Sequence, residues 1–390
     1  MNNVYIYLFA ILMISCNKSD NDSPKKNVST VTFDPNSKIY YPDLHLGEDD
    51  YINSFFVQND KLFLNNKKVY KCVGKNINYE GLLSFGNGTY SNFGHGYPYI
   101  NDNSFIYEYK IYNFDYSSRK ISNEINLQNL IPNGTIKNHE LRRSYSTLGS
   151  NFAILPFYMD KANSYGEYCG SVCLFKKESN NWKFVKRING DNDHNYAFFG
   201  AWIFIKEDYV LISAPGTEYS RYGSGDIDFD NAEGAVFLYK YNDGDLELIK
   251  RFERSYDPKV DQIFDGFGAS ACLSDKFVII TDNVFDAIEI YDLNSGSLYK
   301  RIESSSSISE FGTKCHIDDQ YLYVNSKDEV YVFDIAADFR HIRTLAPENK
   351  DSRLGFGFIR TGDWMASTDN LIIIASPFFH DDGTVLVYYK

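Results

Sequence analysis

Proline and methionine are scarce in this sequence, with 10 and 4 residues among 390, and no Pro-rich, Gly/Ser-rich or charged linker follows about residue 30. A chain of this length is too long for most single-core domains, so the lack of a linker favours one large repetitive domain. Aromatic residues are plentiful by contrast, with 32 tyrosines and 30 phenylalanines. Such side chains favour half-buried strand surfaces, and the composition therefore predicts an all-β fold.

Positive charge is also in short supply. Lysine and arginine total 39 against 52 aspartates and glutamates, which gives a formal net charge of −13 at pH 7. A surface of this sign opposes binding to phosphate backbones, so we expect no nucleic-acid partner. The acids are spread through turns rather than gathered in a tail, an arrangement that keeps a protein surface soluble.

The six cysteines lack the density and the CxxC pairs of a disulfide or zinc framework. Cys169 and Cys173 are four residues apart in a predicted strand, about 13 Å at about 3.3 Å per residue, which is too far for a disulfide. We interpret these two residues, together with Cys72, Cys272 and Cys315, as buried thiols.

An apolar run from Val4 to Ile14 opens the chain. It is too short to cross about 30 Å of hydrocarbon as a helix, so it predicts an export signal. The run ends in Met-Ile-Ser-Cys, which resembles a bacterial lipobox. The resemblance implies cleavage before Cys16 and acylation of that cysteine. The alternative is an ordinary signal peptide with a chance cysteine.

The next residues, Asn17 to Lys26, are polar, contain proline and have nothing apolar to bury, as expected of a flexible tether. Their acidic part, residues 19–22, also resembles the surface-export signals of Bacteroidetes lipoproteins. The implied location is the outer membrane or cell surface, with the lipid anchor as the contact to the membrane. The predicted organisation is a signal peptide over residues 1–15, a tether over 16–27 and a folded domain over 28–390.

One pattern recurs through the chain, most clearly after the Phe-Gly pairs at 267–268, 311–312 and 356–357. Each copy contains a strand of small residues, a β-branched strand, a strand of alternating apolar and polar residues, and a fourth strand that often ends in a basic-apolar pair. Four short strands in every forty to fifty-five residues, roughly, are typical of a propeller blade.

Seven such units predict a seven-bladed β-propeller. The last unit stops at its third strand, residues 384–389, which would leave the ring open. We therefore expect the strand-like segment 28–33 to supply the missing fourth strand and remove a free sheet edge. The units are 46–77, 84–126, 139–188, 197–252, 265–302, 309–345 and 354–390.

Two copies resemble the FG-GAP repeats of integrin α-subunit propellers and their bacterial relatives, and weaker matches extend the resemblance over residues 140–390. In such a pair the glycine allows a tight turn or a close strand approach, and the phenylalanine fills the gap between blades. The repeated pair therefore predicts core rather than catalysis. The matching segments are 199–200, 210–216 and 234–239 in one copy, and 356–357, 374–377 and 383–388 in the other.

FG-GAP blades often bind calcium through a DxDxDGxxD loop before the second strand, but the corresponding turns here are too short and too poor in oxygen ligands. A different acidic run lies in the long loop 215–233, where Asp226, Asp228 and Asp230 alternate with other residues and Glu233 follows. Curling of the backbone could bring these carboxylates to one Ca²⁺. The alternative is a solvated acidic loop.

The loops between second and third strands of a propeller leave at the same end as the connections between blades. This topology predicts that the long loop lies beside residues 191–196 and shares its face with residues 380–382. An aromatic and acidic face of this kind suits neutral or cationic ligands, including sugars. The candidate ligand-binding residues are Asp191, Asp193, His194, Tyr219, Arg221, Tyr222, His380, Asp381 and Asp382.

Catalytic motifs are missing from the sequence, which has no Asp-box, HExxH, GxSxG, P-loop or strand-linked GxGxxG, and nothing singles out two carboxylates for glycoside hydrolysis. We interpret His316, beside Cys315 on a predicted inner strand, as a packed or hydrogen-bonded residue. The leading hypothesis is a lipid-anchored binding or adhesion module for a glycan, peptide or partner protein. The alternatives are a propeller enzyme acting on extracellular polysaccharide, as a glycoside hydrolase or lyase, and a scaffold subunit of an envelope complex.

Overall fold

The computed structural model shows regular structure that is almost entirely β-strand in the described residues, which contain one short 3-10 helix, η2 (Leu127–Leu130). In the described part of the chain, no helix has the length and apolar character of a membrane span. The structure describes residues 28–31, 38–39, 55–58, 61–64, 68–73, 76–82, 84–85, 99–101, 104–107, 109–115, 117–136, 146–160, 169–179, 181–190, 197–216, 234–254, 266–304, 310–326, 329–346, 365–376 and 384–390.

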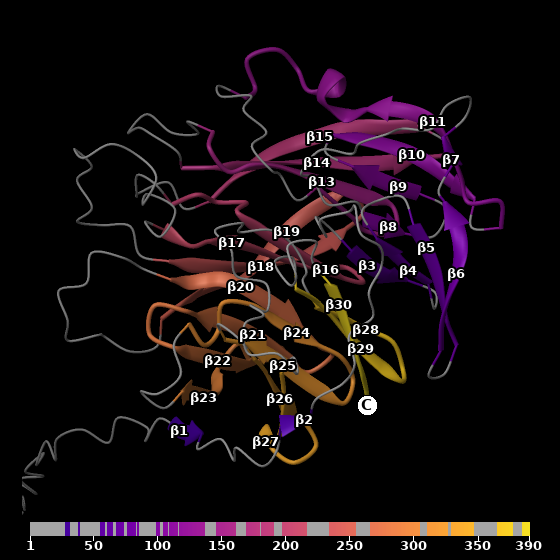
Figure 1. The fold of residues 1–390 in the computed structure, drawn as a ribbon. Coiled ribbons are helices and arrows are strands. Elements are labelled where there is room, and N and C mark those ends of the chain that lie inside the picture. The colour runs from indigo at the N-terminus through magenta and orange to yellow at the C-terminus, as the bar shows by residue number, and fades with distance from the viewer. Residues whose placement is uncertain are drawn as a thin grey trace, which may run out of the picture.

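Seven sheets follow one another along the described residues and confirm the predicted all-β, seven-bladed propeller (Figure 1). Within each blade, consecutive strands pair antiparallel, and each sheet overlaps one predicted unit, although some boundaries differ by about ten residues. Blade 1 contains β3 (Phe55–Gln58), β4 (Lys61–Leu64), β5 (Lys68–Val73) and β6 (Asn76–Leu82). Blade 2 contains β8 (Tyr99–Asn101), β9 (Ser104–Tyr107), β10 (Lys110–Asp115) and β11 (Lys120–Asn126). Blade 3 contains β12 (Thr147–Leu148), β13 (Phe152–Phe157), β14 (Ser171–Glu178) and β15 (Asn181–Asn189).

The second half of the ring continues the same order of strands. Blade 4 contains β16 (Trp202–Lys206), β17 (Tyr209–Ala214), β18 (Ala235–Asn242) and β19 (Asp245–Glu253). Blade 5 contains β20 (Phe267–Leu273), β21 (Phe277–Asp282), β22 (Ala287–Asp292) and β23 (Leu298–Ser304). Blade 6 contains β24 (Cys315–Ile317), β25 (Tyr321–Asn325), β26 (Val330–Asp334) and β27 (Arg340–Leu345). Blade 7 contains β28 (Met365–Ser367), β29 (Leu371–Ser376) and β30 (Thr384–Tyr389).

The N-terminal strand does not pair with residues 384–389, which corrects the prediction for segment 28–33. Its described part, β1 (Val28–Val31), pairs in parallel with β23 of blade 5. The next strand, β2 (Lys38–Ile39), pairs in parallel with β27 of blade 6. Blade 7 instead contacts blade 1 through the inner strands β28 and β3. The N-terminal segment therefore covers two other free sheet edges, whose unpaired backbone groups accept a strand equally well.

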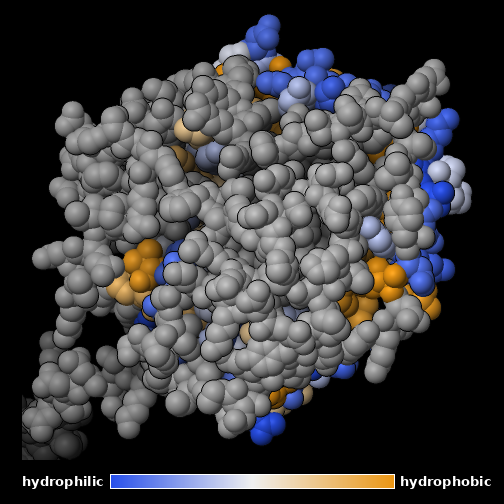
Figure 2. Space-filling model, in the orientation of Figure 1, coloured by the Kyte–Doolittle hydropathy of each residue, from blue (hydrophilic) through white to orange (hydrophobic). Residues whose placement is uncertain are grey.

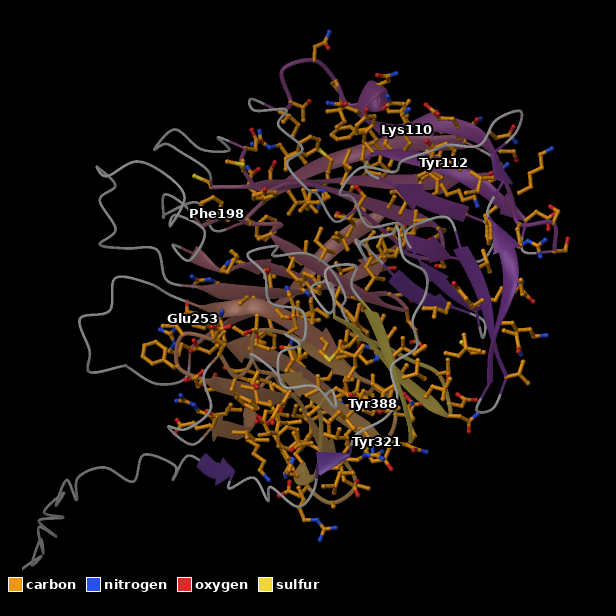
Figure 3. All side chains as sticks on the ribbon, in the orientation of Figure 1. Lys110, Tyr112, Phe198, Glu253, Tyr321 and Tyr388 are labelled. Atoms are coloured by element: carbon orange, nitrogen blue, oxygen red, sulfur yellow. The ribbon has the colours of Figure 1, made fainter. Side chains whose placement is uncertain are left out.

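The two ends of the ring differ in the lengths of their connections. We call the end with the turns between first and second and between third and fourth strands the short-turn end. The opposite end, with the connections between second and third strands and between blades, is the long-loop end. Phe198 and Glu253 lie at the long-loop end, whereas Tyr321 and Tyr388 lie toward the short-turn end, on the other side of the view (Figure 3).

The Phe-Gly pairs at 199–200, 267–268 and 311–312 lie where successive blades meet, as predicted, whereas the pair at 356–357 lies outside the described residues. The phenylalanines at 199, 267 and 311 are fully buried, and the following glycines at 200, 268 and 312 have φ of +94°, +85° and +85°. A Cβ atom on Gly312 would lie 2.7 Å from the carbonyl oxygen of Ala287 in the preceding blade. Only glycine combines this backbone conformation with so close an approach.

Ion pairs between neighbouring blades line the short-turn end. Each joins a lysine of one blade to an aspartate in a turn of the next blade. Their distances are 3.1 Å for Lys176–Asp243, 2.6 Å for Lys206–Asp275 and 3.0 Å for Lys300–Asp338. Water and salt screen such exposed pairs, so the apolar interfaces between blades, rather than these pairs, provide most of the stability.

Large apolar side chains at the surface are few and lie mainly on outer strands. Val185, Ile249 and Tyr299 occupy the extra residue of a β-bulge at the same place in β15, β19 and β23. Hydrophilic side chains dominate the upper right rim of the molecule in Figure 2, where β11 lies in Figure 1. The exposed apolar side chains at the β-bulges are isolated from one another, and single exposed apolar residues are normal on a protein surface.

Candidate functional site

The residues that the sequence singled out for lipidation, calcium binding and ligand binding lie outside the described residues. The strands next to them are described, however, and fix the end of the ring from which the loops leave. β17 ends at Ala214 and β18 begins at Ala235, so the long loop leaves the long-loop end of blade 4. The residues concerned are Cys16, Asp191, Asp193, His194, Tyr219, Arg221, Tyr222, Asp226, Asp228, Asp230, Glu233, His380, Asp381 and Asp382.

A backbone contact joins the bases of two of these loops. The N–H of Gly216, at the start of the long loop, donates to the carbonyl of Ala197, which follows residues 191–196, at 3.3 Å. Gly170 and Phe199 form a parallel bridge between blades 3 and 4. The connections of two neighbouring blades therefore start side by side, as expected for one composite binding face.

The innermost strands near this face are joined by a tryptophan. Trp202, at the start of β16, donates from Nε1 to the carbonyl of Ala271 on β20 at 3.0 Å. The ammonium of Lys314, just before β24, lies 4.2 Å from the centre of the indole ring. Both residues are buried, so this cation–π contact is partly desolvated and links blades 4, 5 and 6.

The side chain of Asn325 holds Lys314 in place. Its Oδ1 accepts from the backbone N–H of Lys314 at 2.6 Å, and its backbone N–H donates to the carbonyl of Lys314 at 3.1 Å. Sequence reasoning did not find the Trp202–Lys314 pair. The tryptophan two residues after Phe199-Gly200 was a usable signal, whereas nothing in the sequence relates Lys314 to it.

The five described cysteines are buried and not in disulfides, as predicted. Burial raises the pKa of the Cys173 thiol to about 12, an effect that the nearby Arg187 only partly offsets. A thiol that stays protonated is a poor nucleophile and a poor metal ligand. Among the described residues, moreover, no three His, Cys, Asp or Glu side chains are grouped as a metal site.

His316 is packed and hydrogen-bonded, as predicted. Its Nε2 lies 2.9 Å from Oγ of Ser367 on β28, and its ring stacks on Tyr323 with centroids 5.9 Å apart. A serine beside a histidine can be a nucleophile with its base. Here, however, burial lowers the pKa of the imidazole to about 4, which makes it a weak base. The pair therefore joins blades 6 and 7 rather than performing catalysis.

The lowered pKa of His316 predicts an acid-sensitive contribution to stability. Below its ordinary pKa of 6.5, the unfolded chain binds a proton that the folded chain binds only near pH 4. Stability is therefore fully present above pH 6.5 and falls as the pH drops toward 4. We expect the urea midpoint of His316→Gln to fall less between neutral and acidic pH than that of the unaltered protein. If the urea midpoints of the two proteins fall equally between neutral and acidic pH, His316 is not the source of the acid sensitivity.

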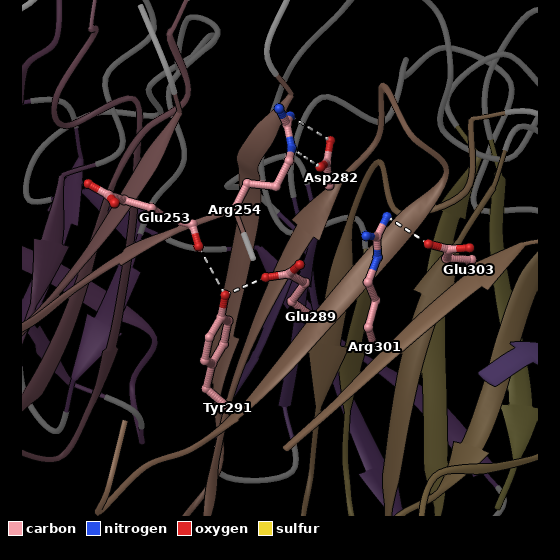
Figure 4. A network of polar contacts seen from close by, with 7 residues as sticks. All are labelled: Glu253, Arg254, Asp282, Glu289, Tyr291, Arg301 and Glu303. Atoms are coloured by element: carbon pink, nitrogen blue, oxygen red, sulfur yellow. Dashed lines mark hydrogen bonds and ion pairs between the residues drawn. The ribbon is translucent and has the colours of Figure 1, made fainter. Parts of the chain in front are cut away.

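A network of charged side chains lies between blades 4 and 5 at the long-loop end (Figure 4). Arg254 contacts Asp282 through Nε and Oδ2 at 2.6 Å and through Nη2 and Oδ1 at 3.3 Å. Its guanidinium also lies 4.6 Å from the ring centre of Phe285. The Asp282 side chain is fully buried, so this fork holds a carboxylate that water does not reach.

The same network continues to Tyr291, whose hydroxyl faces Oε2 of Glu289 and the backbone carbonyl of Glu253 at 3.1 Å (Figure 4). Burial, and then the carboxylate of Glu289, raise the pKa of Tyr291 far above its usual value, so the phenol remains a hydrogen-bond donor. Since Glu253 belongs to blade 4 and Tyr291 to blade 5, this bond also joins two blades.

One arginine recurs at the same place in the fourth strands of blades 3, 4 and 5. It follows a lysine at 187, 251 and 301, and in blades 4 and 5 it pairs with the glutamate two residues further along the same strand. Arg187 pairs with the buried Asp160, whose Oδ2 also accepts from Ser171 Oγ at 2.8 Å. Arg301 pairs with Glu303 at 2.9 Å. Each of these arginines is paired with a carboxylate of its own blade, so the charged groups are poor candidates for binding a ligand.

No protein-family model and no curated protein matches this sequence. Among solved structures, the chain is similar to a putative 6-phosphogluconolactonase from Bacteroides fragilis, with 11% identity over 77% of this chain and 86% of that chain and a TM-score of 0.49. It is also similar to Hsv2 of Kluyveromyces lactis, with 11% identity over 88% of this chain and 98% of that chain and a TM-score of 0.46. Similarity at this level carries neither a substrate nor a partner to this chain.

Proposed function

We propose that this propeller is a lipid-anchored binding module of the cell surface, and that its long-loop end binds a glycan, peptide or partner protein. The scaffold is a rigid ring, because large buried side chains fill the interfaces between blades. The anchor is the acyl chain proposed for Cys16. FG-GAP-like repeats, in this proposal, supply the scaffold and not the specificity.

One contrast carries the proposal. The buried charges of the described body have structural partners, as Arg254 and Asp282 do between blades 4 and 5. The long loop 215–233, in contrast, combines tyrosine, arginine and several acids in a connection that no blade requires. Loops on a rigid scaffold are the usual place for binding residues. The acids and aromatics favour a neutral or cationic ligand, sugars included.

Replacing residues 217–233 by a Gly-Ser linker should abolish binding without unfolding the ring. We expect at least about a tenfold loss of affinity, or about 1.4 kcal/mol, for any extracellular polysaccharide or glycan-array component that the unaltered protein retains. The thermal midpoint should stay nearly constant, because blade 4 keeps its four strands. If the linker variant binds as tightly as the unaltered protein, the ligand binds at a part of the propeller other than the long loop.

A second variant, which loses negative charge at the opposite end of the ring, separates the binding face from general electrostatics. Replacing Asp243, Asp275 and Asp338 by asparagine removes three charges at the short-turn end, where their side chains are well exposed. This triple variant should bind the same polysaccharide as tightly as the unaltered protein. An equal loss of binding in both variants would show that net charge, and not the long loop, governs the interaction.

Calcium should stabilise the protein if the acidic run of the long loop binds it. A ligand at a hundred times its dissociation constant adds about 2.7 kcal/mol to the free energy of unfolding. We expect the melting midpoint to rise by a degree or more, roughly, on changing from EDTA to millimolar Ca²⁺. Asn substitutions at Asp226, Asp228 and Asp230 should remove the shift. A shift that survives these substitutions would assign calcium to another place.

A further inference from the structure

The direction of β1 shows from which end the chain enters the propeller. β1 is parallel to β23, with Val28 opposite Arg301 and Val31 opposite Ser304. β23 begins at Leu298, directly after the turn 293–297 at the short-turn end. β1 therefore runs from the short-turn end toward the long-loop end, and the backbone before Val28 points toward the short-turn end. β2 repeats this direction on β27, with Lys38 opposite Thr344 and Ile39 opposite Leu345.

We propose that the short-turn end of the propeller faces the membrane and that the long-loop end faces outward. This inference rests on the lipid anchor at Cys16 that the proposed function includes. It deepens that function, because it makes the long-loop end the surface that extracellular ligands meet first. The partner of the short-turn end is accordingly a lipid surface.

The length of the tether supports this orientation. Positions 28 and 16 are 12 residues apart in sequence. A flexible segment of this length has a mean end-to-end distance of roughly 20 Å, at about 5–6 Å times the square root of its length. The six-residue strands of blade 5 are about as long, at about 3.3 Å per residue. To reach a membrane at the long-loop end, a tether that leaves toward the short-turn end would have to run back along the blade. That path would take up most of its mean end-to-end distance.

Charge favours the same orientation independently. The lysines at 176, 206 and 300 face aspartates of neighbouring blades, so these charges of the short-turn end are balanced. The sequence of the connections at the long-loop end contains acidic runs at 191–193, 226–233 and 381–382. An anionic leaflet repels carboxylates within about a Debye length of its surface. The acidic end is therefore repelled more strongly than the balanced end.

Two single-cysteine labels can measure the orientation. Asn294→Cys places a fluorophore at the short-turn end of blade 5, and Asn133→Cys places one near the long-loop end of blade 2. Both asparagines are exposed, whereas the five described cysteines are buried and should not react. The full-length acylated protein is bound to phosphatidylethanolamine–phosphatidylglycerol vesicles that contain an acceptor-labelled lipid. Energy transfer to the lipid then reports the height of each label.

We expect about twofold greater energy transfer from position 294 than from position 133, because one strand length, roughly 20 Å, separates the two ends. The same labels on a variant with Ser29→Pro and Thr30→Pro test the role of β1, since proline removes the backbone donors that pair with β23. The difference between the labels should then disappear while the melting midpoint remains, because the ring closes without β1.

Two results would overturn the proposed orientation or its anchor, and a third would overturn the role of β1 in setting the orientation. Equal or reversed transfer from vesicle-bound protein would refute the orientation and leave the anchor intact. A difference that persists in the double proline variant would show that β1 does not set the orientation. If the full-length protein fails to bind vesicles and a Cys16→Ser protein behaves identically, Cys16 is not a lipid anchor. The proposed function would then be refuted as well.

Discussion

Gly312→Ala should lower the free energy of unfolding by roughly 3 kcal/mol, since two penalties add. The backbone at this residue has a φ of +85°, which costs an alanine about 1–2 kcal/mol. The new Cβ would also lie 2.7 Å from the carbonyl oxygen of Ala287, so blades 5 and 6 must move apart. That movement would also lengthen the hydrogen bond from the backbone N–H of Phe311 to Oδ1 of Asp286, which joins the same two blades at 2.9 Å.

Gly134→Ala is the matched control for this prediction. Gly134 has a similar φ of +79°, but nothing lies within 4 Å of the position of its Cβ. Its substitution should therefore cost only the backbone penalty, about 1–2 kcal/mol. Urea denaturation of both variants measures the difference, which isolates the contact between blades. Equal losses for the two variants would show that the close approach at Gly312 contributes nothing.

Arg254→Met should destabilise the protein by about 3 kcal/mol or more, because removing one partner of a buried ion pair leaves the other charge uncompensated. Asp282 is fully buried, and the fork of Arg254 reaches both of its carboxylate oxygens. The substitution also removes the contact of the guanidinium with Phe285. Thermal and urea denaturation would show the loss as a lower midpoint.

A double variant separates the charge from the packing. Adding Asp282→Asn to Arg254→Met removes the buried charge, so it should restore part of the lost stability. Lys300→Met, in contrast, breaks the exposed pair with Asp338 and should have a much smaller effect, since solvent screens that pair. If the double variant is less stable than Arg254→Met alone, the uncompensated charge of Asp282 is not the cause of the lost stability.

The fold was predictable because its repeat is local. Most blades show their strands and turns within a short stretch of sequence, and several also begin with a Phe-Gly pair, so each predicted unit overlaps one observed sheet. The position of the N-terminal strand was predicted wrongly for a related reason. A short run such as Val28 to Val31 shows that a strand forms, but every blade offers a similar outer edge, and nothing in the run selects β23 over β30.

The contacts between blades were less accessible from the sequence. Trp202 and Lys314 are separated by more than one hundred positions, and their contact depends on the width of the intervening blade 5. Nothing in the sequence around Arg254 and Asp282 indicates that their side chains are buried, because their burial depends on the contact between neighbouring blades. The loops at the long-loop end were recognised by composition alone, and composition does not determine which of their side chains meet.

The parallel pairing of β1 and β23 has a mechanical consequence. A pull on the chain before Val28 toward the short-turn end acts along the strand, so it loads all four residue pairs of β1 in shear at the same time. If the strand were antiparallel, its N-terminus would lie at the long-loop end. The same pull would then separate its residue pairs one after another. The lipid anchor that we propose at Cys16 would transmit such pulls whenever the surrounding medium flows. The geometry of a single short strand thus makes the attachment of the tether resistant to the drag that the ring itself creates.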